Sequence, residues 1–557
     1  MPKGLWVVGV WSLLGVGCSK DARLAPLLPP CTASGDSIRL GVAAYGTVDP
    51  GPISGCMVFP DNPTGSAIAY LLVPQAVNGV PDDASAFLLR GDTVVAAAAP
   101  ALAASVIAPR PGAQQQFDLT LRRAERDLVQ RLGPPPRPPL APRVTAAVAP
   151  INAGDRRVFK VCGNLVCNKH PTVVAFAKTV GVHIAVFVDS VARAHGDTLT
   201  TISVDSLADV FDTLLYARDT AAFGRESDID NNGVVIVLMT GKVNSLVSST
   251  GCADSGYVGG YFYGGDLLPG FSGGNNAEIF YSIVPDPSGT LSCQHTAGEV
   301  TRNVAVTFIH EFQHMISWRH HVLNGGFPED LWLNEGLSHY AEELGGRIFL
   351  PDTTTYCYFL FGDLVNSGSY LARPDSFSLV DTAGIGGLEN RGAYWLFVRF
   401  LVDQFAPTLG APDSVTRRLD DTTFSGAANV GNASGTPFET IVEHWALANY
   451  VSDLPGFTPP PELQYTSWHF RTDYPALHKA CLNRGVTAKV PIAFPLVPMS
   501  SDGSAVNLVG TMRGGSGTYQ LAQQAAGAAG FTLLFGDPSG RALRAALEPR
   551  LNVIRIK

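Results

Sequence analysis

Residues 296–319 read TAGEVTRNVAVTFIHEFQHMISWR, and residues 332–344 read WLNEGLSHYAEEL. The first stretch opens with a T-x-x-E capping box and continues with apolar residues at helical spacing, which predicts one long helix. The second stretch also has helical apolar spacing and predicts a second helix. His310 and His314 are four residues apart, so they lie one turn apart on the same face of the first helix.

The pattern His310-Glu311-x-x-His314 suits a metal ion. Two imidazoles on one helix face can bind the same tetrahedral zinc ion, and Glu311 then stands next to the metal, within reach of a water molecule. The alternative interpretation is an ordinary amphipathic helix that carries two structural histidines. A catalytic zinc site also needs a third protein ligand and an open position for water.

Two residues compete for the place of the third ligand. His320 lies six residues after His314, the spacing of a metzincin, but Ser317 stands where that arrangement needs Gly, and no Met follows Met315 until Met499 to form a Met-turn. Glu335 is the better candidate, because a carboxylate from the second predicted helix would complete a His-His-Glu site. The connection between the helices is long enough for an antiparallel return.

His310-Glu311-x-x-His314 followed by Asn334-Glu335-Gly336 resembles the gluzincin clan, to which thermolysin and aminopeptidase N belong. The longer runs, residues 310–318 and 332–344, are similar to the hyicolysin family of neutral zinc metallopeptidases. The resemblance covers roughly residues 155–450. It implies a thermolysin-like domain, with a mixed sheet and a helical subdomain. It also implies His310, His314 and Glu335 as ligands of one Zn²⁺ ion and Glu311 as catalytic base.

The same resemblance implies a further hydrogen-bond donor to the developing oxyanion, beyond the third zinc ligand. Tyr394 is the candidate, because it follows Glu335 at about the distance found for the tyrosine of the aminopeptidases. Packing of Tyr394 into a helix core beside Trp395 and Phe397 is the alternative. His339 and Glu342 share the side of the helix near Glu335, where they either orient the ligands or only form helix surface.

The composition limits the class of protein. The chain has 557 residues, of which 46% are hydrophobic and 16% charged, with a formal net charge of -9. Such a chain forms several domains with apolar cores and is neither disordered nor a coiled coil. No basic block marks a nucleic-acid partner.

The order of predicted elements indicates an α+β multidomain protein. Strands are expected at 157–162, 172–178, 183–189 and 234–239, and an amphipathic helix at 115–132 precedes a proline-rich linker. The predicted parts are a signal peptide with lipobox (1–18), an N-terminal β domain (19–110), the helix and linker (111–154), the zinc metallopeptidase domain (155–475) and a C-terminal β-sandwich-like domain (476–557).

The N-terminus predicts export. Lys3 precedes the apolar stretch 5–16, which is the pattern of a secretory signal, and the residues up to Cys18 resemble a bacterial lipobox in which that Cys takes lipid. Gly15 departs from this lipobox pattern, and ordinary secretion is the alternative. Eight further cysteines allow four disulfides in an oxidising compartment. The simplest arrangement is sequential pairing: 31 with 56, 162 with 167, 252 with 293 and 357 with 481.

A second metal motif is incomplete. Asp228, Asp230 and Asn232, followed by Gly233, resemble the start of a calcium loop. The residue eleven positions after Asp228 is Met239, so the bidentate Glu of an EF-hand is missing. A plain turn is the competing interpretation, and Ca²⁺ stays a secondary expectation.

The expected function is a secreted or lipid-anchored zinc endopeptidase that hydrolyses extracellular proteins, with membrane contact through the lipid alone. An aminopeptidase would need an acidic anchor for the substrate's amino group, and no such motif precedes His310. The alternative from another class is a surface adhesion lipoprotein with a vestigial zinc site, although the intact Glu311 argues against decay. A proenzyme with residues 19–150 as an inhibitory segment is compatible with the first hypothesis.

Overall fold

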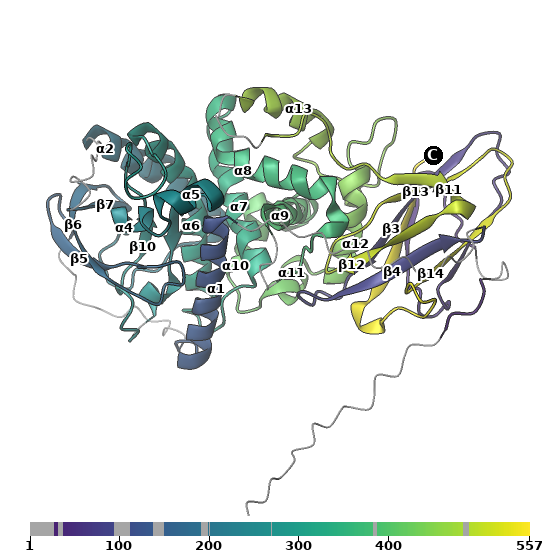
Figure 1. Ribbon diagram of the computed structural model, residues 1–557, viewed down its shortest axis with the longest axis horizontal. Helices are drawn as coiled ribbons and strands as arrows, with labels where there is room; N and C mark the ends of the chain where they lie inside the picture. The colour runs from purple at the N-terminus through teal and green to yellow at the C-terminus, as the bar shows by residue number, and fades with distance from the viewer. Residues whose placement is uncertain are drawn as a thin grey trace, which may run out of the picture.

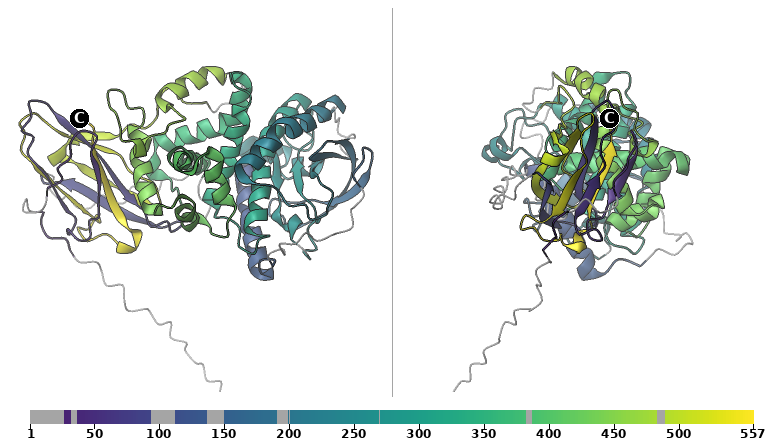
Figure 2. Two further views of the ribbon diagram at one scale, coloured as in Figure 1. Left: turned by 180° about the vertical axis from the view of Figure 1, so that it is seen from behind. Right: turned by 90° about the vertical axis from the view of Figure 1, so that its right-hand side faces the viewer.

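The computed structural model describes residues 27–31, 37–93, 112–136, 150–190, 199, 201–268, 270–381, 387–482 and 489–557. They form three parts that lie in a row along the longest axis (Figure 1). A six-stranded sheet with its helices stands at one end, a group of helices occupies the middle, and a β-sandwich stands at the other end. The view from behind shows the same order (Figure 2). The prediction of a mixed α and β protein with several sheets is confirmed.

The first part is built on a mixed sheet. Its strands, in spatial order, are β5 (Arg156–Lys160), β6 (Thr172–Val180), β7 (Ile184–Asp189), β8 (Val235–Met239), β10 (Ile279–Ser282) and β9 (Gly260–Phe262). Neighbours β7, β8 and β10 are parallel, and the other pairs are antiparallel. The first four lie within two residues of the predicted strands. Strand β9 forms one edge of the sheet.

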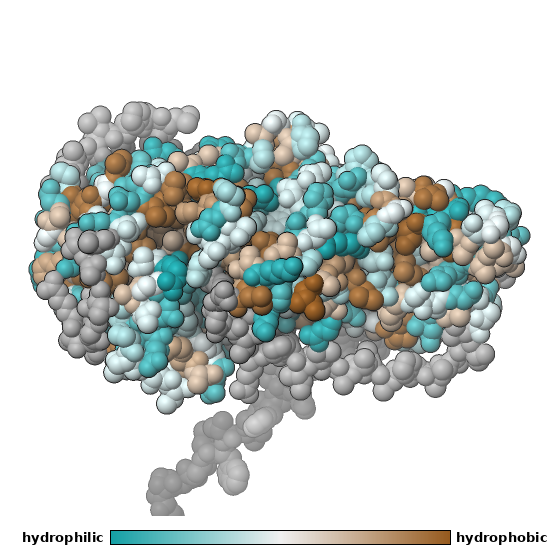
Figure 3. All heavy atoms as spheres, turned by 90° about the horizontal axis from the view of Figure 1, so that it is seen from above, coloured by the Kyte–Doolittle hydropathy of each residue, from teal (hydrophilic) through white to brown (hydrophobic). Residues whose placement is uncertain are grey.

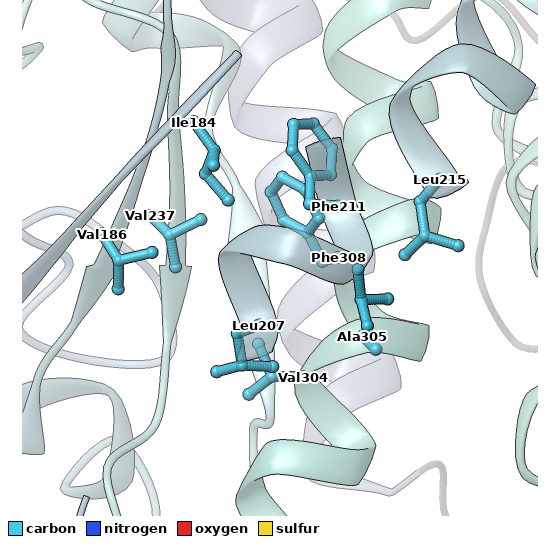
Figure 4. Close-up of a pocket in the computed structure, with 10 residues that line it drawn as sticks. Ile184, Val186, Leu207, Phe211, Leu215, Val237, Val304, Ala305 and Phe308 are labelled. Carbon is cyan, nitrogen blue, oxygen red and sulfur yellow. The ribbon is translucent and has the colours of Figure 1, made fainter. Parts of the chain in front are cut away.

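Helix α6 (Ala297–His321) carries the His-Glu-x-x-His motif and packs against this sheet. The ring centroid of Phe308 in α6 lies 5.1 Å from that of Phe280 in β10 and 4.3 Å from that of Phe211. A cavity of about 20 Å³ remains between α6 and strands β7 and β8 (Figure 4). Its lining is entirely apolar, so it is a dry packing void and not a ligand site.

The other helical segments of the first part precede or connect its strands. They are α1 (Ala113–Leu132), α2 (Thr201–Val210), the π-helical turn η2 (Phe211–Leu215), α3 (Tyr216–Phe223), α4 (Gly241–Asn244), α5 (Ser249–Ser255) and η3 (Gly264–Leu267). Helix α1 runs along the boundary between this part and the middle part (Figure 1). The helix was predicted, but its position at that boundary was not.

The middle part is helical. It consists of α7 (Leu331–Arg347), α8 (Thr353–Ala372), η4 (Pro374–Ser376), α9 (Leu388–Leu409), α10 (Pro412–Asp420), α11 (Gly426–Ser434), α12 (Phe438–Val451), η5 (Pro461–Leu463) and α13 (Phe470–Ala480). Helix α7 is buried from Leu331 to Gly346. It approaches α9 closely at Gly336, where an added Cβ would lie 2.9 Å from the carbonyl oxygen of Tyr394. Gly336 of the Asn-Glu-Gly motif therefore sets the spacing of these two helices.

The β-sandwich combines strands from both ends of the chain. One sheet has the order β1 (Tyr45–Val48), β15 (Pro549–Arg555), β3 (Ile68–Ala76), β13 (Gln520–Gln524), β11 (Met499–Asp502). The other has the order β12 (Asn507–Arg513), β4 (Ala84–Gly91), β14 (Phe531–Gly536), β2 (Cys56–Phe59), and the turns η7 (Gly503–Ala505) and η8 (Ala545–Leu547) lie between C-terminal strands.

The prediction of separate N-terminal and C-terminal β domains is therefore wrong. Strand β3 pairs with β15 and β13, and β4 pairs with β12 and β14, so strands from both ends share each sheet and one apolar core. The sandwich also contacts the helices, because Tyr519 donates to the carbonyl oxygen of Ala446 at 2.8 Å and Gln75 donates to that of Val442 at 3.2 Å. Alternation along a strand predicts its buried face but not its partner.

Four disulfides link the eight cysteines as the sequential pairing predicted: Cys31–Cys56, Cys162–Cys167, Cys252–Cys293 and Cys357–Cys481. Disulfides in this number indicate an oxidising, extracellular environment. The predicted signal segment and lipobox lie outside the described residues. Among the residues described, no helix has the length and apolarity that crossing a membrane requires. The face seen in Figure 3 mixes hydrophilic and hydrophobic side chains along its length.

Candidate metal centre

His310, His314 and Glu335 meet between α6 and α7. His310 Nε2 lies 3.5 Å from Glu335 Oε2, and His314 Nε2 lies 3.6 Å from Glu335 Oε1. Two ligands bound to a tetrahedral zinc ion at 2.0–2.1 Å are about 3.4 Å apart. The three side chains are buried, and their donor atoms lie within 4.8 Å of one another. The spacing and the donor types fit a zinc ion with three protein ligands.

The far sides of both imidazoles are held by hydrogen-bond acceptors. His310 Nδ1 lies 2.7 Å from Glu342 Oε1, and His314 Nδ1 lies 3.0 Å from Asn334 Oδ1. Because these oxygens accept, each histidine is favoured as the tautomer with its proton on Nδ1 and its lone pair on Nε2. Both Nε2 atoms then face Glu335, which is the arrangement that a metal ligand requires.

A second grouping of metal-binding residue types, His310, His339 and Glu342, overlaps the first. Its His310 Nδ1–Glu342 Oε1 distance of 2.7 Å is that of a hydrogen bond and is too short for two ligands on one tetrahedral ion. His339 Nδ1 lies 3.0 Å from Glu342 and 2.8 Å from Asp363. His339, Glu342 and Asp363 therefore form a buried network behind His310 and orient it.

The charges at the centre favour a cation. Burial alone would raise the pKa of Glu335, but Arg391, whose Nη1 lies 3.1 Å away, and the two histidines hold this pKa well below its usual value. Burial alone would lower the pKa of His310, but Glu335 and Glu342 raise it well above 6.5. Two carboxylates thus favour positive charge at His310, and a divalent ion can supply that charge in place of a proton.

His314 behaves differently from His310. Burial lowers the pKa of His314 well below 6.5, and the positive charge of Arg122 lowers it further. The imidazole of His314 is therefore neutral at physiological pH, which is the state that binds a metal.

Glu311 is positioned by the edge strand of the sheet. Its Oε2 accepts a hydrogen bond from the backbone N–H of Phe262 in β9 at 2.8 Å. Burial raises the pKa of Glu311 to about 8, against the opposing effect of His310. A carboxylate with a pKa near neutrality can both accept and return a proton at physiological pH, as a general base must.

Helix α1 lies against β9 and the metal centre. Gln114 accepts from Gly259 N at 2.8 Å and donates to Gly260 O at 3.0 Å, and Arg122 donates to Phe262 O at 2.6 Å. Among these backbone groups, the carbonyl oxygens of Gly260 and Phe262 point away from the partner strand β10. The side chains of α1 thus occupy hydrogen-bonding positions that another extended chain would use to pair with this edge.

A cavity of about 300 Å³ remains between α1 and the start of α7. Its lining includes Arg122 and Arg126 of α1 and Asn334, the residue that holds His314. Arg126 also forms an ion pair with Asp330 at 3.1 Å, which fastens α1 to the N-terminal end of α7. The space next to the metal centre is therefore bounded by α1.

Tyr394 lies on α9, three residues after Arg391, and is buried. Burial raises its pKa well above 10, and a hydrogen bond with Asp381 adds to the shift. The phenol therefore stays protonated and donates its one proton to Asp381. Arg391, and not Tyr394, contacts Glu335 through an ion pair. The role of Tyr394 as hydrogen-bond donor to the oxyanion stays a prediction.

The sequence reasoning missed several residues around the centre. Arg391 binds Glu335 and, through Nη2, Asp118 of α1 at 2.8 Å, and Arg122 of α1 also lies beside β9. A signal was present: Asp118, Arg122 and Glu125 share one face of α1 at helical spacing, next to its apolar residues. Charged side chains there need buried partners.

Replacement of Glu342 by Ala is expected to weaken zinc binding by about 10- to 100-fold, because His310 loses the acceptor that orients it. Competition with a chromogenic zinc chelator measures this affinity. Glu389→Ala, on the first turn of α9 and outside the centre, serves as the control. Equal zinc affinity in the Glu342 and control variants would contradict the orienting role.

Comparisons with known proteins add no family assignment, because no protein-family model and no curated protein matches the chain.

Proposed function

We propose that the protein is a zinc-dependent endopeptidase that hydrolyses extracellular proteins, secreted or tethered by an N-terminal lipid. The observation that carries the proposal is the convergence of His310 Nε2, His314 Nε2 and the Glu335 carboxylate at metal-ligand spacing, beside the buried carboxylate of Glu311. The resemblance of the two motifs to gluzincins, and to the hyicolysin family in particular, supports the same function.

His310, His314 and Glu335 would hold the zinc ion. When bound, zinc acts as a Lewis acid toward a substrate carbonyl and makes a water molecule acidic enough to lose a proton near neutral pH. Glu311 accepts this proton as general base and returns it to the leaving amine. Tyr394 is our candidate for donating a hydrogen bond to the oxyanion.

The edge strand β9 is the expected docking strand for substrate. An extended peptide can add to a free sheet edge through main-chain hydrogen bonds, and β9 also positions Glu311 through Phe262. Such a peptide would run directly past the general base. This geometry favours cleavage within a chain over removal of single terminal residues.

Helix α1 makes the chain latent in this proposal. Because Gln114 and Arg122 already bond to the backbone of β9, a substrate strand pairs there only after α1 moves away. The sequence hypothesis of an inhibitory segment at 19–150 is thereby narrowed to α1. Strands β1 to β4 belong to the sandwich, and their removal would take β3 out of the middle of its sheet.

Casein hydrolysis by the purified protein tests the proposed activity. We expect hydrolysis to be lost after treatment with a zinc chelator and to return when about one equivalent of zinc is added. Measurement after limited proteolysis, which can release α1, prevents latency from hiding the activity. Cleavage that persists without zinc, or no cleavage by zinc-loaded protein in which α1 has been removed, would contradict the proposal.

A further inference from the structure

A second oxygen-rich cluster lies outside the candidate metal centre, where strands β8 and β10 begin. The loop 228–233 leads into β8, and Glu278 directly precedes β10. The two strands are parallel, with Ile279 opposite Ile236, so their starting ends lie at the same edge of the sheet. Carboxylate oxygens of Asp228, Asp230 and Glu278 lie within 4.8 Å of one another.

Glu278 is a buried carboxylate with half of its hydrogen-bonding capacity unused. Its side chain is only 1% exposed. Oε1 accepts from Ser227 Oγ at 2.6 Å and from Ile229 N at 2.9 Å, whereas Oε2 is buried and has no hydrogen-bond partner among the described residues. Burial raises the pKa of Glu278 to about 7. A buried carboxylate oxygen without a partner is costly unless a cation binds it.

The loop is held by hydrogen bonds between its own residues. Asn231 and Gly233 have positive φ angles of 57° and 75°, which turn the chain back toward Asp228. Asp228 accepts from Gly233 N at 3.2 Å, and Asp230 accepts from Asn232 N at 3.3 Å. Arg157 lies 3.4 Å from Asp230 and compensates part of the negative charge. Arg157 thus compensates the charge of one of the three carboxylates, Asp230.

We propose that Asp228, Asp230 and Glu278 form a calcium site in which Glu278 supplies the acidic ligand that the loop lacks in its own sequence. The position where an EF-hand loop carries Glu is Met239 here, which is buried in β8. The sheet pairing instead brings Glu278 to the loop from the neighbouring strand.

The chemistry selects Ca²⁺ from the common divalent ions. The donors are oxygens only, with neither imidazole nor thiolate, which disfavours zinc. Ca²⁺ accepts six to eight oxygens in flexible geometry, whereas Mg²⁺ demands a tight octahedron and keeps its waters. A bound Ca²⁺ would join the starts of β8 and β10, and β10 in turn pairs with β9. The site therefore stabilises the sheet that positions Glu311, and it stands whether or not the protein is a peptidase.

Calorimetric titration of the full chain with CaCl₂ tests the site. We expect about one Ca²⁺ per chain, with Kd in the range of about 10⁻⁶ to 10⁻³ M, weaker binding of MgCl₂, and a higher Tm in CaCl₂ than in EDTA. Glu335→Ala should leave the calcium titration unchanged, which separates this site from the zinc centre. Absence of binding at 10 mM CaCl₂, a concentration about tenfold above the weakest expected Kd, would overturn the proposal.

Glu278→Gln keeps the shape of the side chain and removes its charge, so we expect calcium affinity to fall at least about tenfold. Asp228→Asn, at an exposed position, gives a second variant with the same expected loss if the buried substitution prevents folding. Asp254→Asn, an exposed carboxylate on α5, is the matched control and should bind as wild type does. Wild-type affinity in folded Glu278→Gln or in Asp228→Asn would show that these oxygens do not bind the ion.

Discussion

Glu311→Gln is expected to reduce the rate of casein hydrolysis by about 10²- to 10⁴-fold while the zinc content stays unchanged. The glutamine has the size of the native side chain and can still accept the hydrogen bond from Phe262 N, but it cannot take a proton from water. Hydrolysis rates and zinc content are measured on the same preparation. The variant therefore separates loss of the base from loss of the metal.

The control for this variant is made in two backgrounds. Latency imposed by α1 would hide the effect of any catalytic substitution, so Glu311→Gln is compared with its parent both in the wild-type chain and in a chain with a weakened α1. Activity that survives in the second background would exclude Glu311 as the general base. Loss of zinc together with activity would assign Glu311 a structural role instead.

Phe117→Ala is expected to raise casein hydrolysis by about tenfold or more. Phe117 is fully buried on α1 and packs edge-on against Tyr261 of β9, with ring centroids 5.1 Å apart. Removal of a buried Phe side chain costs about 3–5 kcal/mol. If that cost weakens the docking of α1 on β9, the fraction of molecules with an accessible β9 edge grows by a factor of about 10² or more. Each 1.4 kcal/mol changes the equilibrium constant tenfold.

Two matched substitutions separate release of α1 from general destabilisation. Phe87→Ala removes an equally buried ring from the sandwich core, and Asp127→Ala changes an exposed residue of α1. Phe87→Ala should lower Tm without raising activity, and Asp127→Ala should change neither. A folded Phe117→Ala protein with wild-type or lower activity would show that α1 belongs to the working enzyme.

The centre of the candidate site could be predicted because its residues follow local rules. His310 and His314 are related by one helical turn, and Glu335 lies on the next predicted helix in an Asn-Glu-Gly motif, so helical spacing together with the resemblance to gluzincins predicted three residues that the structure brings together. The sequential disulfide pairing also proved correct. These features depend on residues that are near one another in sequence or paired in simple order.

The features that escaped prediction depend on contacts between distant segments. Arg391 reaches Glu335 from α9, and Phe262 reaches Glu311 from an edge strand of only three residues. Strand β3 pairs with β15 across almost the whole chain, so two predicted domains became one sandwich. Glu278 comes close to the acidic loop at Asp228 only through sheet pairing. No local periodicity reports such long-range pairings.

The central claim is that His310, His314 and Glu335 bind one zinc ion, and elemental analysis of the purified chain tests it most directly. We expect about one zinc per chain in the wild-type protein and in Glu278→Gln, and much less in Glu335→Ala, which removes one of three ligands. A wild-type chain that binds no zinc, or a Glu335→Ala chain that keeps all of it, would contradict the account.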